Sequence, residues 1–244
     1  MSEIIFVRHG QASFGQASYD KLSELGLTQV RHLSRHWNGL GETFGQIYMG
    51  SLQRQRETAN ELLMLAESNP PRSYVDDSFN EYNGDPLIRI YLRDFAASEG
   101  ISSDVKTPIR DERLFQRIFE KATSKWLCDQ LVPNEDDSDF ESWGTFKRRV
   151  YSGLDGIMSK YSNGSRTLVS TSGGVIATAL QRVLNFPDEQ VIQTNWMVRN
   201  SSVTRIRYGN GKMSVTQFNS LAHLERKGMT DLITYRLMVQ VIGF

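Results

Sequence analysis

Near its N-terminus the chain reads Ile4-Ile5-Phe6-Val7-Arg8-His9-Gly10-Gln11. The first four residues form a continuous apolar run, which predicts a short buried β-strand. A cation and an imidazole follow at the point where this strand must end, and Gly10 lets the backbone approach a ligand. Because ligands of open α/β sheets bind at the carboxyl ends of the strands, we expect a ligand site around Arg8 and His9.

The rest of the N-terminal half alternates between helix and strand patterns. Thr28 is predicted to cap a helix that turns one apolar face inward, made of Val30, Leu33, Trp37 and Leu40. A second short strand is predicted at residues 47–49, and a helix from about residue 53 to residue 66. This alternation favours an α/β fold with a mostly parallel sheet.

The C-terminal half resumes the same alternation. Residues 167–170 predict a strand, and Gly173-Gly174 opens another helix. Two further strands, at residues 203–208 and 213–218, flank Gly209-Asn210-Gly211, which is a strong hairpin signal. The apolar tail, residues 232–244, fits packing either on the domain or on a second subunit.

The middle of the chain has no convincing buried strand between residues 87 and 139. Apolar spacing predicts one helix at about residues 87–95 and another at about residues 115–126. We therefore expect a single domain, residues 1–244, with a helical insertion at about residues 87–139 that lies over the sheet. The acidic run at residues 135–139 lacks the glycine and the spacing of a calcium loop, so it is predicted to be a solvated loop.

Composition excludes several classes of protein. Lys plus Arg and Asp plus Glu are both 28, so no basic excess indicates binding to nucleic acid or to an anionic membrane. The single cysteine, Cys128, cannot form an intrachain disulfide, which fits a reducing compartment. No apolar run reaches the roughly 18 residues of a membrane span, and the N-terminal run is too short for a signal peptide. We expect a cytoplasmic protein.

Three strand ends carry the groups of an anion site. One predicted strand is followed by Gly50-Ser51-Leu52-Gln53-Arg54, and another by Thr171-Ser172-Gly173-Gly174. Both segments open a helix, so backbone N–H groups and the positive end of the helix dipole face the same space as Arg8 and Arg54. Two arginines and two helix N-termini match the charge and the oxygens of a phosphate monoester. In such a site His9 is either a proton shuttle or a nucleophile.

The ordered motifs resemble the histidine phosphatase superfamily, which has the phosphoglycerate-mutase-like fold. Residues 7–11 look like its R-H-G signature, and residues 50–59 are similar to its S-x-L-x-R-x-x-x-T-A motif. Residues 79–82 resemble its L-x-E segment, and residues 142–143 and 200–203 are also similar to family positions. R-H-G alone is a weak signal, whereas the ordered set spans nearly the whole chain.

The resemblance implies a three-layer α/β/α sandwich and a role for each matched residue. His9 would attack phosphorus and form a phosphohistidine, and Glu81 would protonate the leaving oxygen. Arg8 and Arg54 would bind the phosphate oxygens and stabilise the transition state. Ser172 and Gly173, at the start of a helix, are also predicted to bind phosphate, and for Ser172 the alternative is that it only fills space. Water would then hydrolyse the phosphoenzyme, and this chemistry requires no metal or organic cofactor.

Three positions depart from the family pattern. The family usually has a second histidine before Gly-Gly, and here Ser172 takes that place, so the site loses an imidazole. Gly15 stands where many relatives have an asparagine that contacts phosphate. Asp85 stands where relatives often have a glycine, four residues after Glu81.

Other residues have less defined roles. Gln11, Gly15 and His223 are predicted to lie near the substrate, and a structural hydrogen bond is the alternative for His223. His32 and His36 have the spacing H-x-x-x-H, but residue 33 is leucine rather than the glutamate of a zinc protease, and no third ligand is evident. We therefore predict no metal site.

The sequence leaves three functions open. The first is a phosphomonoesterase. Ser172 keeps open a second, a non-catalytic or weakly active member of the fold that binds a phosphorylated ligand. The third is a phosphomutase, although no segment indicates a lid that would shield the phosphoenzyme from water. The expected partner is a small phosphorylated substrate or a phosphoprotein, with no nucleic acid and no membrane, and the chain is expected to be a monomer or a homodimer.

Overall fold

The apolar run at residues 4–7 lies in strand β1 (Ser2–Arg8), and all four of its side chains are fully buried. The computed structural model describes residues 1–13, 20–64, 70–102, 105, 107, 109 and 111–235. The chain divides into two compact units, Met1–Glu81 with Arg149–Phe244, and Tyr82–Arg148. β1 and the predicted site belong to the larger unit. The expectation of one domain with an insertion at about 87–139 stays a prediction.

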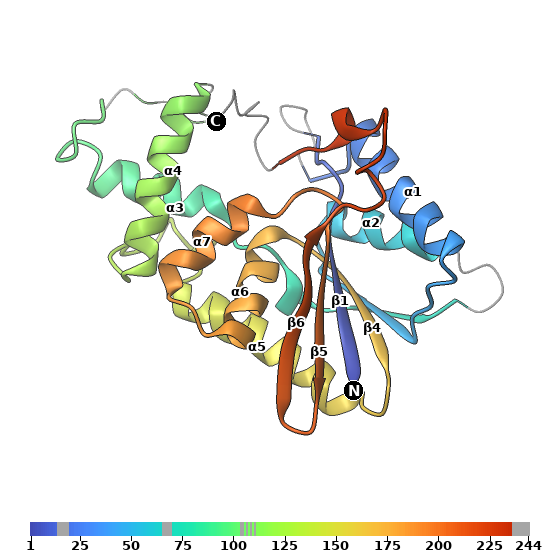
Figure 1. Ribbon diagram of the computed structural model, residues 1–244. Helices are drawn as coiled ribbons and strands as arrows, with labels where there is room; N and C mark the ends of the chain where they lie inside the picture. The colour runs from blue at the N-terminus through green and yellow to red at the C-terminus, as the bar shows by residue number, and fades with distance from the viewer. Residues whose placement is uncertain are drawn as a thin grey trace. The chain divides into compact units, whose positions relative to one another are not determined.

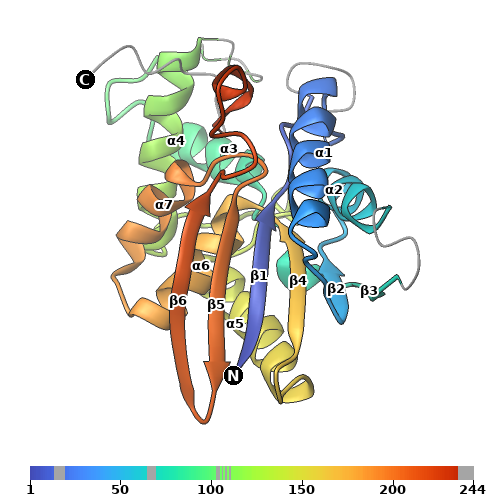
Figure 2. The ribbon, with the colours of Figure 1, turned by 45° about the vertical axis from the view of Figure 1, so that its right-hand side comes forward.

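The sheet of the larger unit has six strands among the described residues, in the order β3-β2-β4-β1-β5-β6. The first four strands pair in parallel: β3 (Arg72–Val75), β2 (Gln46–Met49), β4 (Arg166–Thr171) and β1. β5 (Val203–Gly209) and β6 (Lys212–Ser220) are antiparallel and form the predicted hairpin. In Figure 2, blue β1 lies between yellow β4 and orange β5. The predicted α/β fold with a mostly parallel sheet is confirmed.

Helices cover both faces of this sheet. α1 (Glu24–Gly39) and α2 (Gln53–Leu63) lie on one face, and α5 (Trp143–Lys160) and α6 (Gly173–Leu184) lie on the other (Figures 1 and 2). Neighbouring residues of a strand point to opposite faces. Ile5 and Val7 accordingly pack with Val30 and Leu33 of α1 in one apolar cluster. The layers are those of a three-layer sandwich.

The start of α1 differs from the prediction. The helix begins at Glu24 rather than after Thr28, because the Ser23 hydroxyl accepts a hydrogen bond from Gly26 N at 3.0 Å and serves as the N-cap. Thr28 lies inside the helix, where its hydroxyl donates to Glu24 O. Leu40, expected on the buried face, follows the helix and is 64% exposed.

Strand β3 and helix α7 (Asp188–Met197) of the larger unit were not predicted. β3 is a short edge strand whose side chains are mostly exposed, so it lacks the apolar run of a buried strand. α7 packs against α6 and carries only a weak apolar stripe. No helix in the described residues has both the length and the apolar character to cross a membrane.

The smaller unit contains the two helices predicted for the middle of the chain, α3 (Gly84–Asp94) and α4 (Glu112–Leu127). Its acidic run is the exposed loop that was predicted, except at Asp137. The Asp137 side chain is 1% exposed and pairs with Arg89 at 2.8 Å and with Arg93 at 2.7 Å. A hydrogen bond from Asn134 N and the two guanidinium groups lower the pKa of Asp137 to about 2. The two arginines, which lie more than 40 residues away in the sequence, decide the burial of this carboxylate.

Candidate active site

The imidazole of His9, directly after β1, is oriented by two hydrogen bonds. Its Nδ1 lies 2.7 Å from Gly10 O, and Arg54 Nε lies 3.2 Å from its Nε2. A carbonyl oxygen only accepts and a guanidinium N–H only donates. Nδ1 therefore carries the proton, and the lone pair of Nε2 faces Arg54. This neutral tautomer is the form that a nucleophilic histidine needs.

The backbone around His9 is held from three sides. His9 N donates to Thr171 O of β4 at 2.9 Å, and Asn200 Nδ2 donates to His9 O at 3.1 Å. Gly10 N donates to Thr58 Oγ1 of α2 at 3.2 Å. The Thr58 hydroxyl donates in turn to Arg54 O at 2.8 Å. The threonine of the second motif thus links the His9 loop to the turn of α2 that carries Arg54.

Gly10 has a packing role that the sequence did not predict. A Cβ on Gly10 would lie only 2.4 Å from Gly26 O, and a Cβ on Gly26 would lie 2.1 Å from Gln11 O. The loop after β1 and the first turn of α1 therefore approach each other at backbone contact distance. Only residues without a side chain fit this approach.

Arg54, in the first turn of α2, is paired with a carboxylate. It forms an ion pair with Asp20, whose second oxygen accepts a hydrogen bond from Gln53 N at 2.7 Å. The N-cap residue of α2, Leu52, has no polar side chain, so Asp20 supplies the acceptor at this helix N-terminus. Asp20 therefore binds both Arg54 and the N-terminus of α2, which were predicted to bind phosphate. No sequence motif marks it.

Arg8 is the second predicted phosphate ligand and is 3% exposed. Its guanidinium donates to Val198 O, which precedes the loop at residues 199–202. The same loop binds the end of β1, because Ser201 N donates to Arg8 O at 3.1 Å. The phosphate-binding role of Arg8 stays a prediction.

Glu81 lies at the N-terminus of α6, where its Oε2 accepts a hydrogen bond from Gly174 N at 3.0 Å. The segment before it is fixed by Arg149 of α5, whose Nη1 donates to Asp77 O, to Ser78 O and, at 2.8 Å, to Asn80 O. Glu81 therefore contacts the helix N-terminus formed by Ser172 and Gly173, the two predicted phosphate ligands. This brings the predicted acid to the carboxyl end of β4.

Ser172 and Gly173 join β4 to α6. The parallel register pairs Arg8 with Thr171, so the next residues, His9 and Ser172, stand side by side at the strand ends. Ser172 is 1% exposed, and its hydroxyl accepts a hydrogen bond from Gln55 Nε2 at 2.9 Å. A Cβ on Gly173 would lie 2.3 Å from Asn195 Oδ1, so this glycine permits close packing of α6 on α7. Gln55 was not recognised from the sequence as part of the site.

The predicted substrate-proximal residues have other contacts. Gln11 Oε1 accepts from the Ser23 hydroxyl at 3.0 Å, which ties it to the start of α1. His223 Nε2 lies 2.8 Å from Ser201 Oγ, and burial lowers its pKa to about 3. The structural hydrogen bond weighed for His223 is therefore present. Gly15 lies outside the described residues.

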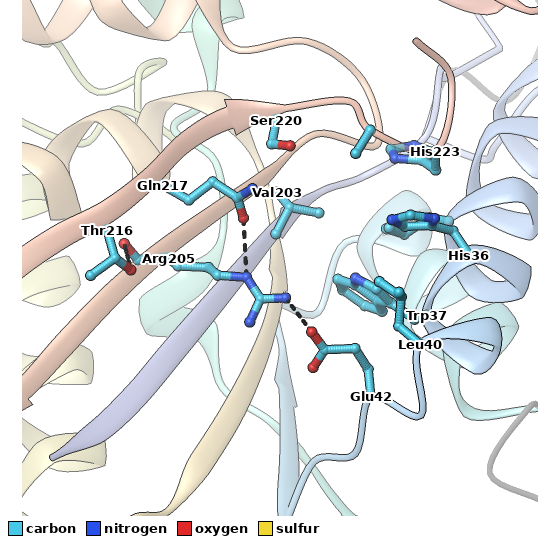
Figure 3. A pocket seen from close by; sticks show the side chains of 12 residues that line it. His36, Trp37, Leu40, Glu42, Val203, Arg205, Thr216, Gln217, Ser220 and His223 are labelled. Atoms are coloured by element: carbon cyan, nitrogen blue, oxygen red, sulfur yellow. Dashed lines mark hydrogen bonds and ion pairs between the residues drawn. The ribbon is translucent and has the colours of Figure 1, made fainter. Parts of the chain in front are cut away.

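His223 also lines a pocket of about 380 Å³ between α1 and the β5–β6 hairpin. Figure 3 shows its ring with His36 and Trp37 on one side and Arg205, bonded to Glu42 and Gln217, on the other. None of His9, Arg54, Glu81 and Ser172 is among the lining residues. The structure thus groups His9, Arg54 and Ser172 with the unpredicted Asp20 and Gln55. His223 lies beside a pocket that none of these residues lines.

The histidine phosphatase superfamily (branch 1) matches the chain over residues 4–87 and 111–221. No curated protein matches this chain.

Three solved structures illustrate the likeness in fold. A putative alpha-ribazole-5'-P phosphatase from Escherichia coli is 19% identical with a TM-score of 0.62, over 91% of this chain and 98% of that chain. Phosphoserine phosphatase from Entamoeba histolytica, in complex with 3-phosphoglyceric acid, is 18% identical with a TM-score of 0.60, over 92% and 100%. Phosphoglycerate mutase from Bacillus anthracis is 21% identical with a TM-score of 0.59, over 91% and 94%. At these identities the likeness shows a shared fold.

Proposed function

Because the chain belongs to the histidine phosphatase superfamily (branch 1), we propose that it hydrolyses phosphate monoesters through a phosphohistidine on Nε2 of His9. The observation that carries the proposal is the orientation of the imidazole. Nδ1 donates to Gly10 O, and the Nε2 lone pair faces the guanidinium of Arg54. A lone pair directed at an arginine is directed at the place where an arginine-bound phosphate would lie.

In the first step the Nε2 lone pair attacks phosphorus, the bond from phosphorus to the ester oxygen breaks, and Glu81 gives its proton to the leaving oxygen. When the substrate enters, Arg54 Nε–H must break its hydrogen bond to His9 Nε2 and donate to a phosphoryl oxygen instead. The hydrogen bond to Gly10 O favours the positive charge that develops on the ring. Arg54 and the N–H groups at the starts of α2 and α6 stabilise the charge on the phosphoryl oxygens.

In the second step a water molecule attacks the phosphohistidine. The bond between phosphorus and Nε2 breaks, the electron pair returns to the ring, and the Glu81 carboxylate takes a proton from the water. Inorganic phosphate leaves, and each residue recovers its initial protonation state. A phosphomutase would instead pass the phosphoryl group back to the same substrate, which an assay of the products from phosphoglycerate distinguishes.

The test compares the wild type with His9→Ala, with His32→Ala as the matched control that removes an imidazole outside the site. Wild type and His32→Ala should release phosphate from p-nitrophenyl phosphate and form an acid-labile phosphoenzyme, and His9→Ala should do neither. Equal turnover by wild type and His9→Ala would remove the proposal. Phosphoserine, 3-phosphoglycerate and alpha-ribazole-5'-phosphate should be the first further compounds assayed, since the similar structures are named for them or contain them.

A second candidate function is phosphate-ligand binding with little or no turnover. It is favoured by two observations: a serine stands beside His9 in place of an imidazole, and Asp20 already pairs with Arg54. In that case phosphorylated ligands should raise the melting temperature, because they bind only the native state. No member of a broad substrate panel should be hydrolysed. Turnover that disappears in His9→Ala would eliminate this candidate.

A further inference from the structure

We infer that Gln55 is a positioning residue for the reaction at His9: its amide orients the Ser172 hydroxyl so that the hydroxyl proton is donated to the phosphoryl group. Gln55 lies in the first turn of α2, directly after Arg54, and is 0% exposed. The inference rests on the proposed phosphatase function and adds a residue to it.

The hydrogen bonds of the Gln55 amide determine which of its atoms faces Ser172. The amide nitrogen lies 3.1 Å from Phe79 O, and a carbonyl oxygen can only accept. The same nitrogen lies 2.9 Å from Ser172 Oγ. Both amide protons are therefore used, one for each partner, and Ser172 Oγ must be the acceptor of its bond with Gln55.

A hydroxyl that accepts in this way keeps its own proton for another acceptor. Among the described residues no hydrogen bond has the Ser172 hydroxyl as donor, and this hydroxyl does not cap its own helix. Ser172 stands beside His9 across the β1–β4 pair, where strands are about 4.8 Å apart. A phosphoryl group on His9 supplies an acceptor at this place, and the site gains a neutral donor where an imidazole is absent.

Gln55 also connects the other parts of the site. Its backbone carbonyl accepts from the Ser170 hydroxyl at 2.7 Å, which ties α2 to β4. Phe79 O, its second partner, lies two residues before Glu81. The side chain therefore links the segment that carries the acid to the strand end that carries Ser172. The inference is that a substitution at residue 55 acts on the reaction through Ser172 and not by touching the substrate.

The experiment is a double-mutant cycle with Gln55→Met, Ser172→Ala and the double variant. Methionine keeps the length of the side chain but removes both hydrogen bonds. We expect each single variant to lose about tenfold to a hundredfold in kcat/KM for p-nitrophenyl phosphate, the effect of one hydrogen bond to a charged group. Because Gln55 acts through Ser172, the double variant should lose no more than Ser172→Ala alone. Losses that multiply, or a Gln55→Met enzyme as active as wild type, would overturn the inference.

Two further measurements keep the test decisive. If Gln55→Met does not fold, Gln55→Glu replaces it. The new carboxylate would accept a hydrogen bond from the Ser172 hydroxyl, so we expect a loss in kcat/KM at least as large as that of Ser172→Ala. Wild-type activity of Gln55→Glu would overturn the inference. His9→Ala tests the proposed function separately. If wild type shows no turnover above His9→Ala, the rise in melting temperature with inorganic phosphate is compared across the same cycle. An equal reduction in both single variants and the double supports the inference, and any other pattern overturns it.

Discussion

Asp20 occupies the place of an anion, and its charge should weaken substrate binding. The carboxylate pairs with Arg54 and accepts from Gln53 N at 2.7 Å, so it uses both the arginine and the helix N-terminus that a phosphate would bind. Asp20→Asn removes the charge and keeps an oxygen that can cap α2. We expect this variant to bind phosphate esters more tightly than wild type.

The exposure of the pair limits the size of the effect. The Asp20 side chain is 38% exposed and that of Arg54 is 13% exposed, and ion pairs that water reaches contribute about 0–1 kcal/mol. Releasing Arg54 from Asp20 should therefore lower KM by at most about fivefold. Salt screens exposed charges, so the difference between wild type and variant should shrink at high ionic strength.

The assay measures KM for p-nitrophenyl phosphate at low and at high salt, with the melting temperature as the check on folding. Glu61→Gln is the matched control, because Glu61 is a carboxylate of α2 that pairs with Arg31 and not with Arg54. It should leave KM unchanged. A KM for Asp20→Asn that is equal to or above the wild-type value at low salt would refute the reasoning, since the carboxylate would then orient Arg54 for the substrate instead of competing with it.

Two other predictions concern stability. Gly10→Ala would place a Cβ 2.4 Å from Gly26 O. This overpacking should lower the free energy of unfolding, measured by urea denaturation, by about 1–3 kcal/mol. The control is Gly39→Ala, whose Cβ would have no atom within 4 Å, and it should change the free energy of unfolding little. A Gly10→Ala protein as stable as wild type would contradict the close backbone approach. Burial lowers the pKa of His223 to about 3, below its ordinary value of 6.5, so between these values the unfolded chain binds a proton that the native protein does not. The free energy of unfolding should therefore fall as pH decreases through this window, by at most about 1.4 kcal/mol per pH unit from this group, and His223→Gln should show a shallower dependence between pH 7 and pH 5. Identical slopes for both proteins would contradict the assignment.

The elements that the sequence predicted correctly are those with a strong local signal. The apolar run at residues 4–7 became β1, and Gly209-Asn210-Gly211 became the turn of the β5–β6 hairpin, in which Asn210 and Gly211 both have positive φ. The prediction was incomplete where the local signal was weak, or where two nearby residues gave the same signal. β3 is exposed and has no apolar run, and both Ser23 and Thr28 are good N-cap residues. The earlier one starts the helix.

The contacts of charged and polar side chains were beyond prediction for a different reason. Asp137 looked like part of a solvated loop, and two arginines of α3 made it a buried ion pair. His223 lies near the end of the last strand as expected, but its partner is Ser201 of another loop. Such partners are chosen by packing between distant segments, which no local pattern records.

The sequence by itself determined where most of the strands and helices lie and which residues follow the strands, because hydrophobic periodicity and turn chemistry act between near neighbours. Only the tertiary structure decided which of those residues meet. Gln55 contacts Ser172 across 117 positions of the chain, and Arg54 contacts His9 across 45. These meetings depend on the register of β1 with β4 and on the docking of α2, and both are set by the packing of the whole core.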